Sequence, residues 1–199
     1  MLKLGLDFDN TLISYDSIFY ETACELNLIP KELKKSKTAV RSYLINQNKE
    51  EKFTELQGEV YGSKIINAKQ TDGMFEALKL IQNKGYELAI VSHKTKNPII
   101  GPKYNLHKSA LNWLEKNKFF DEDGLFINRK NIFFEPTKEE KVKRIQSIGC
   151  THFIDDLQSI LDLIKKDIVK VHYNPGKETF PSNYLNFSNW EKLKYKRIF

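Results

Sequence analysis

Two carboxylates stand at the end of the first apolar stretch of this sequence. Residues 2–11 read Leu-Lys-Leu-Gly-Leu-Asp-Phe-Asp-Asn-Thr, the pattern of a short buried strand followed by Asp7 and Asp9. Side chains two residues apart on an extended segment point the same way, so both acids are expected to face one spot. Two such acids repel unless a cation or a proton lies between them, which indicates a metal site or an acid/base pair. The plain alternative is a strand that runs into an Asx-rich turn.

A second acidic pair follows another apolar stretch. Residues 152–154 read as a buried strand, and Asp155 and Asp156 stand at its end, which repeats the arrangement at Asp7. Asp156 is either a metal ligand or the N-cap of the helix that follows. The sequence pattern leaves that choice open.

Polar residues also follow the apolar strand predicted at residues 86–91. This strand continues directly into Ser92, His93 and Lys94. A right-handed strand–helix–strand crossover places the ends of two parallel strands side by side, so Ser92 is expected near Asp7. Taken alone, Ser92 could equally be a plain serine at a strand end.

A capping box opens the helix predicted at residues 138–149. Thr137 stands three residues before Glu140, a spacing that lets both side chains bond to free backbone amides of the first turn. Lys138 and Lys141 lie three residues apart on this helix, and one of them is expected at the strand ends. We favour Lys138, because the first helical position should lie closest to the site.

The elements that must position these groups alternate between strand and helix. This alternation predicts an α/β fold with a doubly wound parallel sheet, whose ligand crevice lies at the carboxyl ends of the strands. Residues 15–70 break the alternation with three consecutive helical patterns. We therefore expect a core made of residues 1–14 and 71–199, and an α-helical cap insertion at 15–70. Strands are predicted at residues 2–6, 86–91, 132–135, 152–154 and 168–173.

Composition sets broad bounds on the protein. The 199 residues, 40% of them hydrophobic, suffice for one full core with a modest insertion. A formal charge of +6 suits an anionic ligand but does not separate small phosphates from nucleic acid. Cys24 and Cys150 lie far apart in unlike contexts, which argues against a disulfide framework and favours a reducing cytoplasm. No apolar run reaches the ~18 residues of a spanning helix, so no membrane partner is expected, and a cleaved signal would remove the strand that carries Asp7.

Taken in order, these motifs resemble those of the haloacid dehalogenase (HAD) superfamily. The family motifs are Asp-x-Asp-x-Thr, a Ser or Thr after an apolar strand, a Lys, and an acidic pair after an apolar strand. The resemblance covers residues 1–14 and 71–173 and implies a Rossmann-like core. The motifs read here Asp7-Phe8-Asp9-Asn10-Thr11, Ser92, Lys138 or Lys141, and Asp155-Asp156.

The resemblance also implies an activity, which is the Mg²⁺-dependent hydrolysis of a phosphomonoester through an aspartyl-phosphate intermediate. By this resemblance Asp7 is the nucleophile and Asp9 the general acid and base. Ser92 and the lysine would hold the phosphoryl oxygens. Magnesium is expected at Asp7, Asp9, Asp155 and Asp156, and substrate contacts are expected from Asn10, Thr11, His93 and Lys94.

The substrate is not encoded in these motifs. A small inserted cap favours a small soluble phosphomonoester, such as a sugar phosphate, a nucleotide or a similar metabolite. Asp9 points to phosphoryl transfer, because the dehalogenase branch of the family lacks the second acid of the first motif. Two alternatives stay open: a polynucleotide end phosphatase, which only the basic charge supports, and a non-catalytic phosphate-binding module of the same fold.

Overall fold

The computed structural model describes residues 2–175 and 184–193. Residues 176–183 and 194–199, which the sequence assigned to the core, lie outside the described residues. The chain forms two compact units. The core unit comprises Met1–Ile13, Gln70–Lys94 and Lys118–Phe199, and the helical unit comprises Ser14–Lys69 and Thr95–Asn117.

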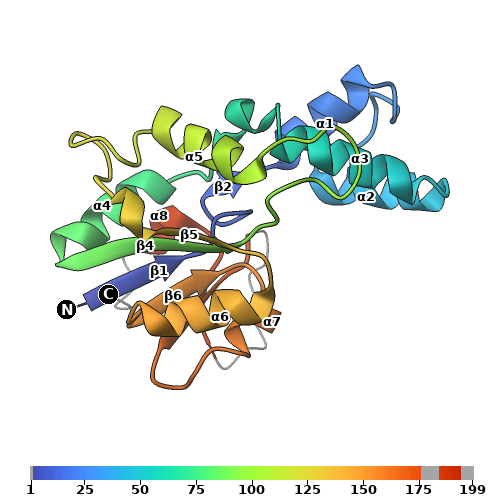
Figure 1. Cartoon of the computed structure of the whole chain (residues 1–199). Coiled ribbons are helices and arrows are strands. Elements are labelled where there is room, and N and C mark those ends of the chain that lie inside the picture. Colours follow the sequence, from blue (N-terminus) through green and yellow to red (C-terminus); the bar gives the residue numbers. More distant parts are fainter. Residues whose placement is uncertain (1, 176–183, 194–199) are drawn as a thin grey trace. The chain divides into compact units, whose positions relative to one another are not determined.

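The core unit is built on a six-stranded parallel sheet in the order β5-β4-β1-β6-β7-β8 (Figure 1). From β1 the chain builds outward through β4 and β5, and it then returns to build in the other direction from β6. The boundary between β1 and β6 is therefore the topological switch point, next to which ligands bind in such sheets. The predicted doubly wound α/β fold is confirmed, and β8 is a strand that the sequence did not indicate. The strands are β1 (Leu2–Leu6), β4 (Tyr86–His93), β5 (Ile132–Glu135), β6 (His152–Asp155), β7 (Val169–Tyr173) and β8 (Leu185–Phe187).

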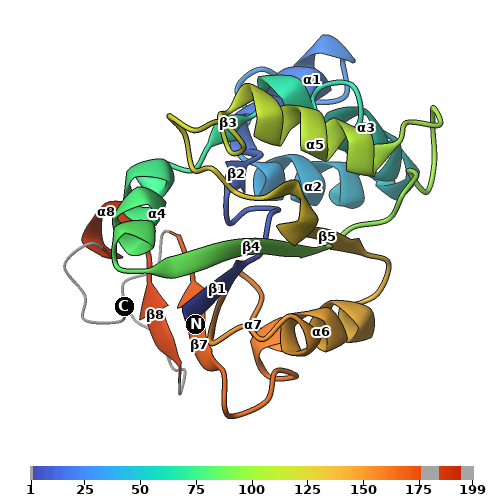
Figure 2. The ribbon, with the colours of Figure 1, turned by 60° about the vertical axis from the view of Figure 1, so that its left-hand side comes forward.

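Helices cover both faces of this sheet. Figures 1 and 2 show α6 and α7 on one face, and α4 with α8 on the other. The predicted capping box at the start of α6 is confirmed, since Thr137 Oγ1 accepts a hydrogen bond from the Glu140 amide at 3.1 Å. The core helices are α4 (Met74–Asn83), α6 (Lys138–Ser147), α7 (Gln158–Leu161), α8 (Trp190–Leu193) and the 3-10 helix η2 (Arg129–Asn131).

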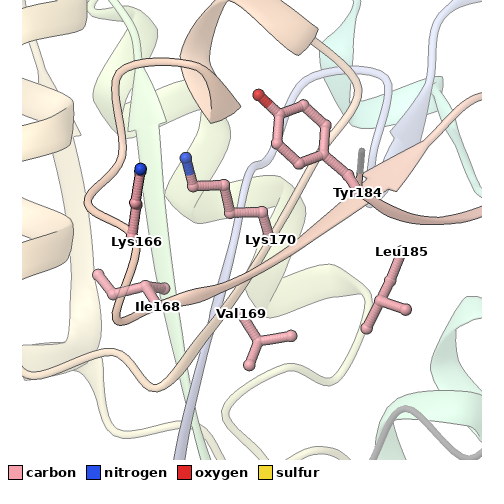
Figure 3. Close-up of a pocket in the computed structure, with 6 residues that line it drawn as sticks. All are labelled: Lys166, Ile168, Val169, Lys170, Tyr184 and Leu185. Atoms are coloured by element: carbon pink, nitrogen blue, oxygen red, sulfur yellow. The ribbon is translucent and has the colours of Figure 1, made fainter. Parts of the chain in front are cut away.

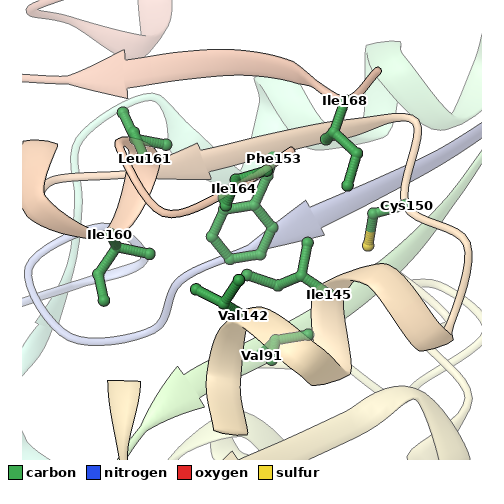
Figure 4. Packing of buried hydrophobic residues seen from close by; sticks show 9 residues of the cluster. All are labelled: Val91, Val142, Ile145, Cys150, Phe153, Ile160, Leu161, Ile164 and Ile168. Atoms are coloured by element: carbon green, nitrogen blue, oxygen red, sulfur yellow. The ribbon is translucent and has the colours of Figure 1, made fainter. Parts of the chain in front are cut away.

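An apolar cluster fills the space between the sheet and the helices α6 and α7. The ring of Phe153, on β6, lies within this cluster (Figure 4). A Cβ atom on Gly5, in the neighbouring strand β1, would lie 2.5 Å from Cδ2 of that ring, so glycine is required there. The glycine lets the ring pack across β1 and β6, the two strands whose ends carry the acidic pairs. The cluster consists of Val91, Val142, Ile145, Cys150, Phe153, Ile160, Leu161, Ile164 and Ile168.

The helical unit contains one segment more than the predicted cap. Thr95–Asn117, which the sequence placed in the core, belongs to the helical unit. Side-chain bonds explain this, because Trp113 Nε1 donates to the Ala68 carbonyl at 2.8 Å and Lys116 Nζ donates to the Ile66 carbonyl at 2.9 Å. The helices of this unit are α1 (Asp16–Glu25), α2 (Lys37–Asn46), α3 (Glu50–Tyr61), α5 (Leu106–Lys116) and the 3-10 helix η1 (Ile65–Asn67).

A two-stranded sheet forms at two of the four places where the chain passes between the units. It pairs β2 (Ile13–Ser14) with β3 (Lys69–Gln70). Among residues 2–175 and 184–193, no helix combines the length and the apolar character that a membrane crossing requires.

Candidate active site

Three carboxylates meet at the carboxyl ends of β1 and β6. Asp7 follows the last residue of β1, Asp155 is the last residue of β6, and Asp156 follows it. Oxygen atoms of the three lie within 4.8 Å of one another. Asp7 is 4% exposed and Asp155 is fully buried. Asp7 of the first predicted acidic pair and both acids of the second pair therefore come together at the switch point of the sheet.

The side chain of Lys141 reaches this group from α6. Its Nζ lies 2.6 Å from Oδ1 of Asp7 and 2.7 Å from Oδ2 of Asp155, and the residue is 1% exposed. Burial alone would lower the pKa of Lys141, but the two adjacent carboxylates outweigh burial and raise this pKa. The ammonium therefore stays charged between the two acids.

The structure corrects the preference for Lys138. Nζ of Lys138 lies 3.3 Å from the Ser159 hydroxyl in an exposed position. Lys141, Val142 and Ile145 form the buried face of α6. Three residues turn a helix by about 300°, so position 138 lies about 60° away from position 141 around the helix and one turn nearer its start, where its ammonium bonds in an exposed position. The direction of the side chain, rather than closeness to the helix start, decides which lysine meets the carboxylates.

The charge of the group fits a divalent cation. With all three acids ionised, three negative charges face the one positive charge of Lys141, which leaves a formal charge of −2. Burial raises the pKa of Asp7 well above its ordinary value, although Lys141 acts in the opposite direction. Burial, followed by repulsion from Asp155, raises the pKa of Asp156 to about 7. A hard cation such as Mg²⁺ prefers oxygen ligands and would relieve this repulsion, and Asp7, Asp155 and Asp156 could hold it.

Asp156 makes hydrogen bonds with Asn10 and His172 and does not cap a helix. Its Oδ2 accepts a hydrogen bond from Nδ2 of Asn10 at 3.4 Å. Its carbonyl lies 3.1 Å from Nε2 of His172, which must donate. The N-cap of α7 is Leu157, whose amide donates to Asp155 Oδ1 at 2.9 Å. Asp156 is therefore not the N-cap of α7. His172 was not predicted as a site residue, because its only signal in the sequence is its place near the end of an apolar strand.

Asp9 lies apart from the three-carboxylate group and pairs with Lys94. Nζ of Lys94 lies 3.0 Å from Oδ1 and 2.9 Å from Oδ2 of Asp9. Lys94 is 4% exposed, although it follows the last residue of β4 and was expected to touch substrate. The carboxylate of Asp9 is therefore paired with a cation of its own and is not part of the group of candidate metal ligands.

Two residues of the predicted motifs carry buried hydroxyls. Oγ of Ser92 and Oγ1 of Thr11 are buried, and neither has a hydrogen-bond partner among the residues that the structure describes. Buried hydroxyls are normally bonded, so the unbonded one of Ser92, near the end of the strand that pairs with β1, is suited to the oxygens of a ligand. His93 is exposed, and its Nε2 lies 3.0 Å from the Pro136 carbonyl, so the structure does not bring it to the carboxylates.

Comparison with solved structures places this architecture among known folds. A phosphoserine phosphohydrolase-like protein from Francisella tularensis aligns over 98% of this chain and 99% of its own, with a TM-score of 0.60 and 19% identity. A HAD-superfamily hydrolase from Ehrlichia chaffeensis aligns over 97% and 94%, with a TM-score of 0.54 and 18% identity. A HAD hydrolase from Bacillus subtilis, solved with bound magnesium, aligns over 98% and 97%, with a TM-score of 0.54 and 16% identity. The chain has the haloacid dehalogenase fold.

Sequence comparisons add nothing to this assignment. No protein-family model matches the sequence, and no curated protein matches it significantly. The haloacid dehalogenase fold nevertheless agrees with the order of the sequence motifs. Asp7 follows β1, Ser92 lies near the end of β4, Lys141 lies on α6, and Asp155 ends β6.

A further pocket of the haloacid dehalogenase core lies at the other end of the sheet. It has a volume of about 490 Å³, and Val169 and Leu185, the first residues of β7 and β8, lie on its wall (Figure 3). Asp7 and Asp155 lie at the carboxyl ends of parallel strands, so this pocket is separate from the carboxylates. It is lined by Lys166, Ile168, Val169, Lys170, Tyr184 and Leu185.

Proposed function

We propose that this chain is a Mg²⁺-dependent phosphatase that hydrolyses a small phosphorylated metabolite through an aspartyl-phosphate on Asp7. The observation that carries the proposal is the buried group in which Lys141 bridges Asp7 and Asp155. A carboxylate is a weak nucleophile toward a phosphate dianion, because like charges repel. A neighbouring ammonium and a divalent cation remove that repulsion and hold the reacting atoms in line.

The proposed reaction has two steps. In the first, an Asp7 oxygen attacks phosphorus, the ester P–O bond breaks, and Asp9 gives its proton to the leaving oxygen. In the second, Asp9 takes a proton from a water molecule whose oxygen attacks the same phosphorus. The bond from phosphorus to Asp7 then breaks, which releases inorganic phosphate and restores both carboxyl groups.

The remaining groups of the site have roles in binding. Mg²⁺, when held by Asp7, Asp155 and Asp156, would neutralise phosphoryl charge as it accumulates. The hydroxyl of Ser92 is proposed to donate to a phosphoryl oxygen, which its buried and unbonded position supports. Lys141 would stay in place through both steps, since its two carboxylate partners are fixed at strand ends.

Two features favour phosphoryl transfer over other uses of this fold. Asp9 stands two residues after Asp7, and a pure phosphate-binding module or a dehalogenase would not need this second acid. The Francisella structure carries the description phosphoserine phosphohydrolase-like, and the Bacillus structure holds magnesium. The helical unit is proposed to act as the cap that selects the substrate, and the small size of the unit favours a small soluble ester.

The direct test is the substitution Asp7→Asn. Purified protein is screened against phosphorylated metabolites with Mg²⁺, and the turnover of the best substrate is compared between the two proteins. Loss of the nucleophile should reduce turnover by about 10³-fold or more and abolish the acid-stable, hydroxylamine-sensitive phosphoenzyme. The exposed Asp167 offers a matched control, and Asp167→Asn should behave as wild type. Turnover of Asp7→Asn within about tenfold of wild type would exclude Asp7 as nucleophile.

A further inference from the structure

Lys94 is a buried lysine that the proposed reaction does not use. Its side chain is 3% exposed, whereas the side chain of its partner Asp9 is 22% exposed. Asp9 is therefore more accessible to a ligand than Lys94 is. The buried ammonium is poorly placed for the substrate contact that the sequence predicted for Lys94. It is well placed to act on the substrate indirectly, through Asp9.

The backbone of Lys94 is held independently of Asp9. The Lys94 amide donates to the Glu135 carbonyl at 2.9 Å, which ties this residue to the end of β5. The ammonium lies 5.5 Å from the ring centroid of Phe8, the residue before Asp9. The backbone from which the cation reaches Asp9 is therefore held by the neighbouring strand β5 and not by the turn that carries Asp9.

Both oxygens of Asp9 contact the same ammonium, at 3.0 and 2.9 Å. A carboxylate held at both oxygens loses most of its freedom to rotate. Burial of a lysine is costly unless it is paired, so rotation of Asp9 away from Lys94 would break a buried ion pair at a cost in free energy. The pair therefore keeps Asp9 in one orientation, apart from the carboxylates of Asp7 and Asp155.

We propose that Lys94 is a positioning residue that fixes the Asp9 carboxyl group in the orientation from which it exchanges protons with the leaving oxygen and the attacking water. The inference rests on the proposed phosphatase reaction and adds a residue to it. A displaced acid slows proton transfer even when its chemistry is intact, because proton transfer requires hydrogen-bond distance.

The first test substitutes Lys94→Met, which keeps an unbranched stem and removes the ammonium. Turnover of an alkyl phosphate should fall about 10²-fold or more, the usual contribution of a positioned acid or base. Formation of the phosphoenzyme from acetyl phosphate, whose leaving group needs no proton, should stay within about threefold of wild type. The aspartyl-phosphate should then accumulate, because the second step lacks its base. Lys94→Arg should restore part of the turnover, since it returns a cation.

The matched control is another lysine–carboxylate pair at the opposite end of the sheet. Lys3 Nζ lies 3.2 Å from Oε2 of Glu87, and Lys3→Met should leave both rates at wild-type values. If Lys94→Met slows phosphoenzyme formation from acetyl phosphate as much as alkyl phosphate turnover, Lys94 supports the whole site and the inference is wrong.

A double-mutant cycle tests whether Lys94 acts through Asp9. Asp9→Asn and the double variant Lys94→Met/Asp9→Asn should turn over alkyl phosphate at rates within about threefold of each other, because nothing remains to be positioned. The double variant removes both charges of the pair, so this comparison holds even if Lys94→Met alone does not fold. An additional loss of about tenfold or more in the double variant would overturn the inference. Absence of turnover in wild type would instead reject the phosphatase proposal, and with it the role of Lys94.

Discussion

Nζ of Lys141 lies 2.6 Å from Oδ1 of Asp7, although 134 residues separate the two in the sequence. Both residues are almost fully buried, and Asp155 completes the contact at 2.7 Å. Removing one partner of such a group leaves uncompensated charge in the core. The same ammonium is therefore expected to matter for stability and for the proposed chemistry.

Separate substitutions of Lys141 and Lys138 distinguish the roles of the two lysines of α6. Lys141→Met leaves Asp7 and Asp155 without their shared cation, so the free energy of unfolding should fall by about 3 to 5 kcal/mol at neutral pH. Turnover should fall by about 10²-fold or more. Lys138→Met should change neither quantity measurably, because its ammonium contacts only the exposed Ser159 hydroxyl in the described structure. Urea unfolding and kcat measure both effects, and a larger loss in Lys138→Met would reverse the assignment.

Metal binding should be visible without any substrate. A cation that binds the folded chain alone stabilises it by about 2.7 kcal/mol at one hundred times its Kd, so Mg²⁺ should raise the Tm and EDTA should reverse the rise. Asp155→Asn should remove most of this response. Ca²⁺ is larger and coordinates more loosely, so it should support turnover poorly. Full activity in excess chelator would contradict the metal proposal.

The pKa of Asp156 predicts how pH affects metal binding. Burial and the Asp155 charge raise this pKa to about 7, so the carboxyl must lose a proton before it binds a cation. A group with this pKa is about 10% ionised at pH 6 and about 90% at pH 8, which predicts a Mg²⁺ Kd about tenfold weaker at pH 6. Titration calorimetry at the two pH values measures this, and Asp156→Asn should flatten the dependence. An equal Kd at both would show that Asp156 does not contact the metal.

The same pKa shift predicts the stability of the metal-free chain. Asp156 keeps its proton up to about pH 7 when folded, but loses it near pH 4 when unfolded. The folded state therefore binds more protons between these values, and the free energy of unfolding should decrease as pH rises from about 4 to 7. Urea unfolding in EDTA with and without Asp156→Asn isolates this contribution. A contribution from Asp156 that increases with pH would contradict the shift.

Salt dependence separates a small substrate from a polynucleotide. Each phosphate that a nucleic acid places against the protein contributes about 0.7 to 0.9 log units of affinity per log unit of salt. Three such contacts would cost roughly thirtyfold between about 50 and 200 mM salt. We expect a far shallower change in KM for a single phosphomonoester. The small-substrate proposal would be wrong if a phosphorylated oligonucleotide were turned over faster at low salt and lost affinity that steeply as salt rises. The net charge of +6 would then indicate a polynucleotide substrate.

The sequence alone determined the order of elements and the segments that carry the site. Apolar strands that end in acids predicted a parallel sheet with Asp7 and Asp155 at one edge, because in such a sheet all strand ends face the same way. The start of α6 was also predictable, since the bond between Thr137 and Glu140 joins residues three apart. Both features depend on periodicity or on neighbours in the chain, so both can be predicted without knowledge of the tertiary structure.

Only the tertiary structure decided how individual side chains are paired. Lys138 and Lys141 are equivalent by type and spacing, and the packing of α6 against the sheet selects Lys141. Lys94 continues a strand that ends at an exposed residue, yet its ammonium is buried against Asp9. Thr95–Asn117 joins the helical unit because of bonds to residues more than 40 positions away. Each outcome depends on the direction of a side chain relative to a distant segment, and local sequence patterns do not specify that direction.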